Sequence, residues 1–329
     1  MSSPMPQLRP MTAGDILDTA IRIYRQNFVR LVGIVAIINV PVLLLTVITL
    51  LLTNPFTTNF SNFSNPSSFS TFGQSPAALI GYLFQLVIGV FSAVAALFQN
   101  AALTVFVSER FLGNAITIRE AYRRALKHWL SLLIVALLLL FAYVALFGAL
   151  GGMIVLPLVG IAALGSQSSA GFSAVMGVLS LCFCALILPA LVLAAFLFTR
   201  WAFFIQAIVL ENYNSTGGLG RSWKLVKGSF WRVLIIIIIL AFIVSLLSVG
   251  PIELFSITSA ALGLIWLAII GGSVISSIVI ILLTPIQYAA LTILYYDLRI
   301  RKEGFDLQMQ LQSTAPASDL PSLIPGAPA

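Results

Sequence analysis

The chain has 329 residues, of which 60% are hydrophobic and only 8% are charged, and its formal net charge is +7. Soluble domains carry about 25% charged residues, so water cannot be the main solvent of this surface. The composition excludes an ordinary soluble domain and predicts a polytopic membrane protein, all-α, built as a helical bundle.

Six apolar runs are long enough to cross a bilayer as helices, which takes about 20 residues. They cover residues 31–53, 77–108, 130–157, 173–199, 233–250 and 260–296. The second, fourth and sixth runs extend to acidic residues, Glu109, Glu211 and Asp297. This extra length predicts that these helices tilt or project into the cytoplasm.

The basic residues predict how the bundle is oriented. They precede the first run and follow the second, fourth and sixth, whereas the three opposite loops contain no Lys or Arg. The positive-inside rule then places both termini in the cytoplasm and predicts a multi-pass protein of the plasma membrane. Glu253 is the one charge on the outer side, and we expect it in a loop beside Pro251.

Positions recur along the chain at an interval of 101 residues. The sets are Ile21, Tyr122 and Trp223; Phe28, Trp129 and Phe230; and the basic Arg22, Arg123 and Lys224. The three members of each set lie near the start of three successive units. Each unit consists of an amphipathic helix followed by a hairpin of two spans. Such a unit begins and ends on one side of the membrane, so its copies run parallel. We predict units near 12–110, 113–212 and 216–303, in a pseudo-threefold arrangement.

These units form one predicted membrane domain, residues 12–306. The flanking segments, 1–11 and 307–329, show few structural signals, and the second is rich in proline. We expect both to be disordered.

The three opening helices are predicted to lie in the cytoplasmic membrane interface. The first has an apolar stripe of Leu17, Ile21, Tyr24 and Phe28, and the second begins with a possible capping box at Thr117 and Glu120. Aromatic residues favour headgroup depth and basic residues favour anionic headgroups. The candidate lipid or interface contacts are Arg22, Arg25, Arg123, Arg124, Lys127, Trp129, Trp223, Lys224, Lys227 and Trp231. Simple anchoring of the helices is the alternative explanation.

No motif indicates catalysis, a cofactor or a metal. The single histidine, His128, has no nucleophile and orienting acid in a recognisable pattern. Cys182 and Cys184 lie two residues apart in an apolar run, so on a helix they point in different directions and should not pair. We expect a protein that is not an enzyme, and basic residues confined to the membrane surface argue against nucleic acid as a partner.

The spans contain uncharged polar residues but no ionisable residue near their centres, which gives ion-coupled transport little support. Gln99, Asn100 and Gln287 are candidates for lining a cavity near the cytoplasmic face. Hydrogen bonding between helices would explain them equally well.

Four segments resemble the glycerophosphoryl diester phosphodiesterase membrane domain family of bacteria and archaea. They are GDILD at 14–18 with Tyr24 and Arg25, EAYRRA at 120–125, RSWKLVKGSFWR at 221–232 and LYYDLRIRKEGFD at 294–306. The resemblance implies a prokaryotic membrane domain over about 12–306, of unknown function in its stand-alone members. Some relatives carry a soluble phosphodiesterase barrel, whose histidine and carboxylate ligands this chain lacks. The resemblance therefore transfers no catalytic residue.

Three functional hypotheses follow from these observations. The first is a scaffold or accessory protein whose basic helices contact anionic lipid or a protein partner at the cytoplasmic face. The second is a transporter or channel for a small or amphipathic solute, and the third is a membrane component of glycerophosphodiester or lipid metabolism. The sequence leaves open the protein partner and any homo-oligomer.

Overall fold

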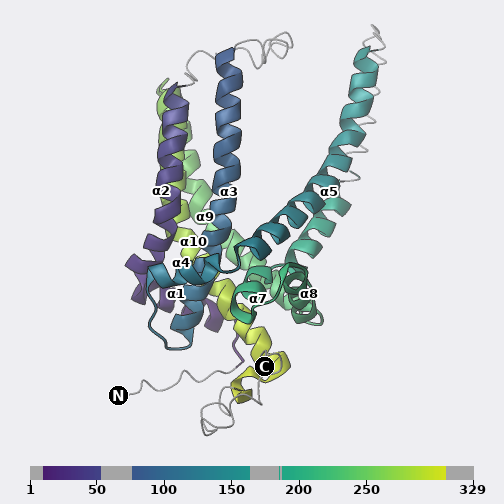
Figure 1. The fold of residues 1–329 in the computed structure, drawn as a ribbon. Coiled ribbons are helices and arrows are strands. Elements are labelled where there is room, and N and C mark those ends of the chain that lie inside the picture. Colours follow the sequence, from purple (N-terminus) through teal and green to yellow (C-terminus); the bar gives the residue numbers. More distant parts are fainter. Residues whose placement is uncertain (1–9, 53–75, 164–184, 186, 309–329) are drawn as a thin grey trace. The chain divides into compact units, whose positions relative to one another are not determined.

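The structure is a computed structural model that describes residues 10–52, 76–163, 185 and 187–308. This part of the chain forms helices and no strand, which confirms the all-helical prediction. The helices are α1 (Ala13–Gln26), α2 (Phe28–Leu52), α3 (Pro76–Phe111), α4 (Ile118–Leu126), α5 (Trp129–Ala163), α7 (Phe204–Glu211), α8 (Ser215–Val226), α9 (Phe230–Ala261) and α10 (Ile265–Glu303) (Figure 1). Cys182, Cys184 and the start of the predicted fourth run lie outside the described residues, as do most of the two terminal segments.

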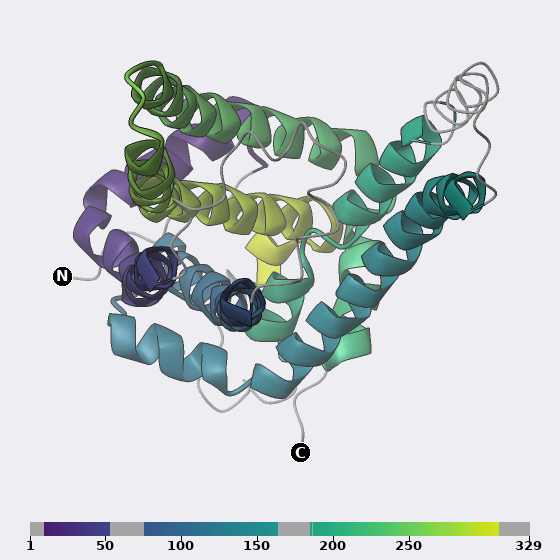
Figure 2. The same ribbon diagram turned by 90° about the horizontal axis from the view of Figure 1, so that it is seen from above.

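The chain divides into two compact units. Unit 1 comprises Met1–Lys127 and Arg232–Ala329, and unit 2 comprises His128–Trp231. In unit 1, α2, α3 and α10 pack against one another, α1 packs on α10, and α4 packs on α3 (Figure 2). Its fully buried side chains come from these helices and include Leu31, Phe106 and Tyr295.

The packing of unit 2 centres on α7, α8 and the turn that precedes α7. Here α8 packs on α7 and on α5. The Ser222 hydroxyl of α8 donates to the carbonyl oxygen of Arg200 at 2.8 Å and accepts the backbone N–H of Phe203 at 3.1 Å. Arg221 donates to both carboxylate oxygens of Glu211, at 2.7 and 3.0 Å. These bonds fix α8 against the turn that precedes α7.

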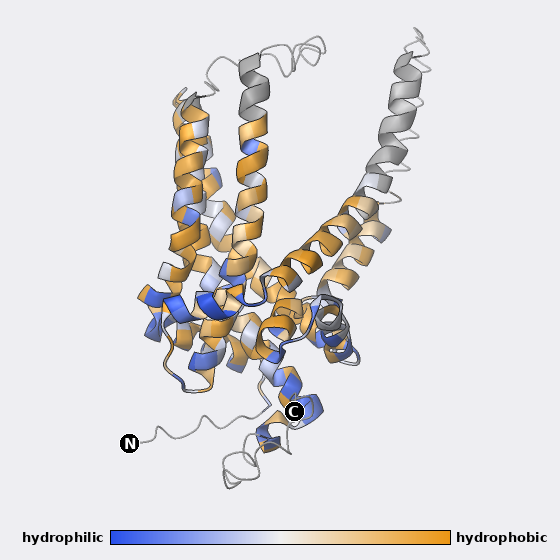
Figure 3. Ribbon diagram, in the orientation of Figure 1, coloured by the Kyte–Doolittle hydropathy of each residue, from blue (hydrophilic) through white to orange (hydrophobic). Residues whose placement is uncertain are grey.

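Among the described residues, five helical segments are long and apolar enough to cross a membrane, or six if one bent pair counts as a span. The five are Phe28–Leu51, Leu83–Phe111, Ile187–Glu211, Phe230–Ala261 and Leu267–Glu303; the pair is Ile118–Leu126 with Trp129–Ala145, bent by 68°. Many of their large apolar side chains are exposed. Figure 3 shows that α2 and α3 consist mainly of hydrophobic residues. By length and hydropathy this is a multi-pass membrane protein.

The loop expected around Pro251 and Glu253 is not there. Both residues lie inside α9, which continues to Ala261, and Glu253 is exposed. The chain turns instead at Gly263, whose φ of 72° suits glycine. A proline removes one backbone hydrogen bond, but in lipid the remaining backbone groups still favour a helix, so α9 runs through it.

Each of the three short helices is followed at once by a long apolar helix: α1 by α2, α4 by α5 and α8 by α9. Local hydrogen bonds set where two of them begin. Thr12 and Asp15 form a complete capping box at α1, which the sequence analysis missed. At α4 the predicted box is half formed, because Thr117 accepts the Glu120 N–H at 3.3 Å while the Glu120 side chain pairs with Arg124. The pseudo-threefold arrangement stays a prediction.

A glycine of α8 tests the packing of unit 2. A Cβ at Gly218 would lie 2.5 Å from Cγ1 of Ile208 on α7, whereas Gly220 of the same helix has open space around it. We expect Gly218→Ala to be less stable than Gly220→Ala by about 1–3 kcal/mol, the usual cost of overpacking. Both variants gain the same helix propensity, so the difference isolates the contact. Thermal unfolding in detergent measures it, and equal stability would refute the packing described here.

Candidate functional site

Helix α1 has two apolar faces with different environments. Ile16, Ala20 and Ile23 are buried in unit 1 and hold the helix on the protein. The stripe singled out in the sequence faces outward instead, with Ile21 44% and Phe28 43% exposed. A helix that is already packed on the protein thus still presents apolar surface to its surroundings.

The cations of α1 lie beside that outward stripe. Arg22 and Arg25 are exposed, and neither makes an ion pair with any residue that the structure describes. The Tyr24 and Phe28 rings meet edge to face with centroids 5.3 Å apart. This combination of exposed aromatic, apolar and unpaired basic side chains is typical of a helix at a membrane surface.

Helix α4 repeats the arrangement in unit 1. Ala121 and Ala125 are buried against the protein. The Tyr122 hydroxyl donates to the Ile34 carbonyl oxygen at 2.7 Å, and burial raises the pKa of Tyr122 to about 12, so the phenol stays neutral. Outside this contact, Leu126 is 50% exposed. Trp129, which begins α5 and belongs to unit 2, is 53% exposed.

The basic residues of α4 differ in their pairing. Arg123 and Lys127 are exposed and make no ion pair within the described part of the chain. Arg124 donates to Glu109 at 2.6 Å and to Glu120 at 2.7 Å. Because both carboxylates already neutralise it, Arg124 is a weaker candidate for a lipid contact than the sequence suggested.

In unit 2, Trp223 has a different role from the one expected. The Arg200 guanidinium lies 4.8 Å from the Trp223 ring, 5.2 Å from Phe196 and 5.7 Å from Phe230. Three aromatic rings therefore surround one arginine, and cation–π attraction uses Trp223 within the protein. Sequence reasoning missed Arg200, whose only signal was its place at the end of an apolar run.

The other candidates of unit 2 lie at its surface. Lys224 and Lys227 of α8 are exposed, and Trp231, the second residue of α9, is 72% exposed. An indole at the start of an apolar helix is suited to headgroup depth.

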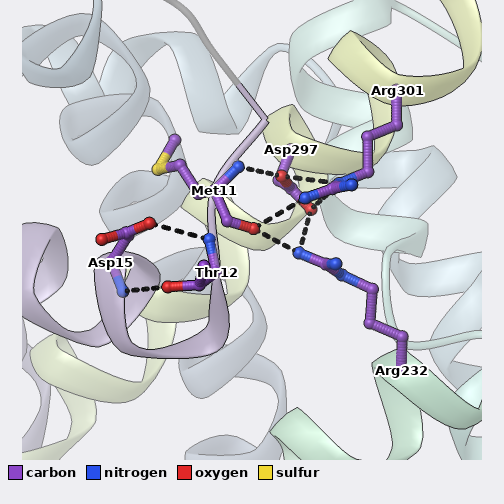
Figure 4. A network of polar contacts seen from close by, with 6 residues as sticks. All are labelled: Met11, Thr12, Asp15, Arg232, Asp297 and Arg301. Atoms are coloured by element: carbon purple, nitrogen blue, oxygen red, sulfur yellow. Dashed lines mark hydrogen bonds and ion pairs between the residues drawn. The ribbon is translucent and has the colours of Figure 1, made fainter.

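Among the ion pairs of the described chain, Asp297 is the most buried carboxylate (Figure 4). Its carboxylate is 0% exposed and accepts the Met11 N–H at 2.7 Å, Arg232 at 2.9 Å and Arg301 at 3.0 Å. The Met11 carbonyl oxygen accepts from the same two guanidinium groups. Met11, which the sequence analysis assigned to the disordered N-terminus, is thus fixed in place, and that assignment was wrong at this residue.

Both oxygens of the Asp297 carboxylate already accept hydrogen bonds from the protein, although the Arg232 Nε is buried without a hydrogen-bond partner. The cluster joins three segments of unit 1: Met11, two residues before α1, the start of α9 and the end of α10. We therefore interpret it as a structural ion-pair cluster that holds these segments together. Sequence reasoning noted Asp297 only as the acidic end of an apolar run.

An uncharged polar cavity of about 490 Å³ lies among α2, α3 and α10 of unit 1. Gln99, Asn100 and Gln287, the three residues expected to line a cavity, all line this one. Its other polar side chains are Asn39, Thr46, Ser92, Ser273, Ser277, Thr284 and Tyr288. No Asp, Glu, Lys, Arg or His is among its lining residues, so it suits an uncharged hydrogen-bonding molecule.

Hydrogen bonds within the cavity wall leave some of its groups available. Asn39 donates its amide to the Gln99 side-chain oxygen at 2.7 Å, which joins α2 to α3. Ser273 and Ser277 donate to carbonyl oxygens one turn earlier, so their lone pairs can still accept. The Asn100 side-chain oxygen is buried without a partner.

No group of three or more His, Cys, Asp or Glu that could hold a metal occurs among the described residues. Long apolar helices, short basic helices and an uncharged cavity define an all-helical, multi-pass membrane protein. A family model described as "Domain of unknown function (DUF7847)" matches residues 11–298, and the chain belongs to that family. No curated protein and no solved structure matches it. The resemblance to the phosphodiesterase membrane domain is not among these findings and stays a hypothesis.

The Asp297 cluster predicts a large effect of one isosteric change. Asp297→Asn removes the charge that compensates Arg232 and Arg301, and breaking a buried ion pair costs about 3–5 kcal/mol. We expect a lower midpoint of thermal unfolding in detergent. The control Glu303→Gln weakens a more exposed pair, with Arg299 at 3.4 Å, and should cost less than about 1 kcal/mol. Equal midpoints for the two variants would contradict the structural role assigned to Asp297.

Proposed function

We propose that this protein is a non-enzymatic scaffold or accessory protein of the membrane that contacts anionic lipid at the cytoplasmic face. The observation that supports it is the outward face of α1 and α4, where exposed apolar side chains lie beside basic side chains without carboxylate partners. The positive-inside distribution of Lys and Arg assigns this face to the cytoplasm.

The division between paired and unpaired arginines gives the proposal its physical basis. When carboxylates pair with an arginine, they compensate its charge and weaken its attraction to a headgroup. Arg124, which pairs with Glu109 and Glu120, is such an arginine. Arg22, Arg25 and Arg123 are exposed and have no carboxylate partner among the described residues. Each basic residue near an anionic leaflet contributes about 1 kcal/mol of attraction.

The lipid contact is tested by removing those three charges together. In Arg22→Gln/Arg25→Gln/Arg123→Gln, enrichment of phosphatidylglycerol over phosphatidylcholine around the purified protein should fall by up to roughly fivefold per charge. Polymer nanodiscs extracted from mixed vesicles, followed by quantification of the retained lipid, measure this. The triple lysine variant at the same positions keeps the charge and should keep the enrichment. Unchanged lipid composition around the glutamine variant would refute the proposal.

A second function, a transporter or channel for a small or amphipathic solute, is favoured by the polar cavity. About 490 Å³ is enough for a polyol-sized molecule, and the lining offers hydrogen-bond donors and acceptors without charge. The absence of ionisable lining residues favours facilitated passage or simple binding over ion coupling. The third hypothesis, a component of glycerophosphodiester metabolism, rests on the sequence resemblance alone.

The solute hypothesis is tested by filling the cavity. Ser277→Leu adds an apolar side chain to the lining, whereas Ser276→Leu changes a neighbouring residue outside it. If the protein passes small polyols, proteoliposomes should swell faster than empty vesicles in stopped-flow light scattering. Ser277→Leu should then remove most of that increase, and Ser276→Leu should retain it. Identical swelling of empty vesicles and native proteoliposomes would rule out a polyol pathway.

A further inference from the structure

A second cavity in unit 1 is surrounded by cations. It measures about 480 Å³ and is lined by Arg30, Arg110, Arg119, Glu120 and the segment 115–118. Arg30 belongs to the first turn of α2, Arg110 to the last turn of α3 and Arg119 to the first turn of α4. None of these three arginines was a candidate lipid contact from the sequence, because only the fold brings them together.

The nearby carboxylates do not neutralise these arginines. Glu109 and Glu120 both accept hydrogen bonds from Arg124, at 2.6 and 2.7 Å, and the second oxygen of Glu109 accepts from Asn114 at 2.7 Å. Arg30, Arg110 and Arg119 make no ion pair with any described residue. The four arginines and two glutamates around the cavity leave an excess of two positive charges.

Arg30 and Arg119 are exposed, whereas Arg110 is partly buried between them and apolar surface, and this arrangement favours an anion. Arg30 acts on Arg110 as a like charge, and the Arg110 Nε is buried without a hydrogen-bond partner. Its guanidinium also lies 5.6 Å from the Phe106 ring centroid, next to apolar surface. All three arginines nevertheless line the same cavity.

The backbone adds to the positive potential. Thr117 caps α4, so the cavity is lined by the N-terminal turn of a nine-residue helix. The first N–H groups of a helix lack intrahelical acceptors and carry the positive end of its dipole. Here this effect supplements the arginine cluster.

We propose that the cavity binds a phosphate group, and that a dianionic phosphomonoester fits it best. A phosphomonoester carries about −1.5 to −2 charges at pH 7, which matches the excess of two positive charges. Guanidinium groups bind phosphate through paired, charge-assisted hydrogen bonds. The phosphate comes from a lipid headgroup or from a soluble phosphomonoester, and a lipid source rests on the function proposed above.

The lipid source is tested by comparing two anionic lipids. Native protein in polymer nanodiscs should retain phosphatidate, a phosphomonoester, in preference to phosphatidylserine. Arg119→Gln should lower that preference by at least roughly tenfold, the loss of one charge-assisted hydrogen bond. Arg123→Gln removes an equal charge from the same helix, but Arg123 does not line the cavity. This variant should therefore lower the retention of both lipids equally. Arg119→Lys, which keeps the charge, should show an intermediate preference.

The charge match predicts a dependence on pH as well. The phosphomonoester loses its second proton near pH 6, so the native preference for phosphatidate should rise between about pH 5 and pH 7.5. The same measurement on Arg119→Gln should give a nearly flat profile. A merely structural role of Arg119 would not change the slope of this profile.

The soluble source is tested in detergent free of phosphate-containing lipid. Inorganic phosphate and glycerol 3-phosphate should raise the midpoint of thermal unfolding of native protein and Arg123→Gln, but not that of Arg119→Gln. Stabilisation together with a phosphatidate preference assigns the cavity to the phosphate group itself. Stabilisation by soluble phosphate without any enrichment of anionic lipid would support the cavity and refute the proposed lipid contact.

Other outcomes overturn the inference by itself. In one such outcome, the protein enriches anionic lipid and loses this enrichment in the triple glutamine variant, but it retains phosphatidate and phosphatidylserine equally and is not stabilised by phosphate. That outcome would support the lipid contact and refute the phosphate site. Equal effects of Arg119→Gln and Arg123→Gln in both assays would do the same.

Discussion

The carboxylate of Asp297 is the interaction on which the arrangement of unit 1 depends. A buried charge is tolerated only when it is paired, and this one is held by two guanidinium groups and a backbone N–H. Its partners are Met11, two residues before α1, and arginines at the start of α9 and the end of α10. The cluster therefore fixes α1 against α10, and this fixed position leaves the stripe with Ile21 and Phe28 facing outward. The candidate lipid surface is a consequence of that packing.

Carboxylates are scarce in this chain, and their placement decides which arginines remain available. Asp297 forms ion pairs with Arg232 and Arg301, and Glu211 with Arg221. Glu109 and Glu120 both pair with Arg124. The cations left over are not scattered evenly. Some lie at the exposed edges of α1 and α4, where solvent and headgroups can reach them, and three surround one cavity. Pairing, more than the number of basic residues, separates a general surface charge from a defined anion site.

Features that depend on neighbours in the sequence were predictable. Apolar runs gave the spanning helices, and the basic segments gave the short helices that precede α2, α5 and α9. Features that depend on distant partners were not. Nothing near Met11 indicates that Asp297 will bind it, and the capping box at Thr117 was half formed because Arg124 competes for Glu120. Gln99, Asn100 and Gln287 do line one cavity, and the signal was their uncharged polar side chains within apolar runs; whether they bind a ligand stays a prediction.

Two cavities on the same helices differ in chemistry because they differ in depth. Asn39 lies nine residues beyond Arg30 on α2, and Gln99 lies eleven before Arg110 on α3. At 1.5 Å per residue the polar cavity is displaced by about 14–16 Å along the helices from the cationic one. Unpaired arginines at the deeper level would meet the high cost of charge in hydrocarbon, whereas at the helix ends they lie at headgroup level. Depth therefore explains why the lining of the inner cavity is uncharged while arginines line the outer one, so a single ligand chemistry does not match both.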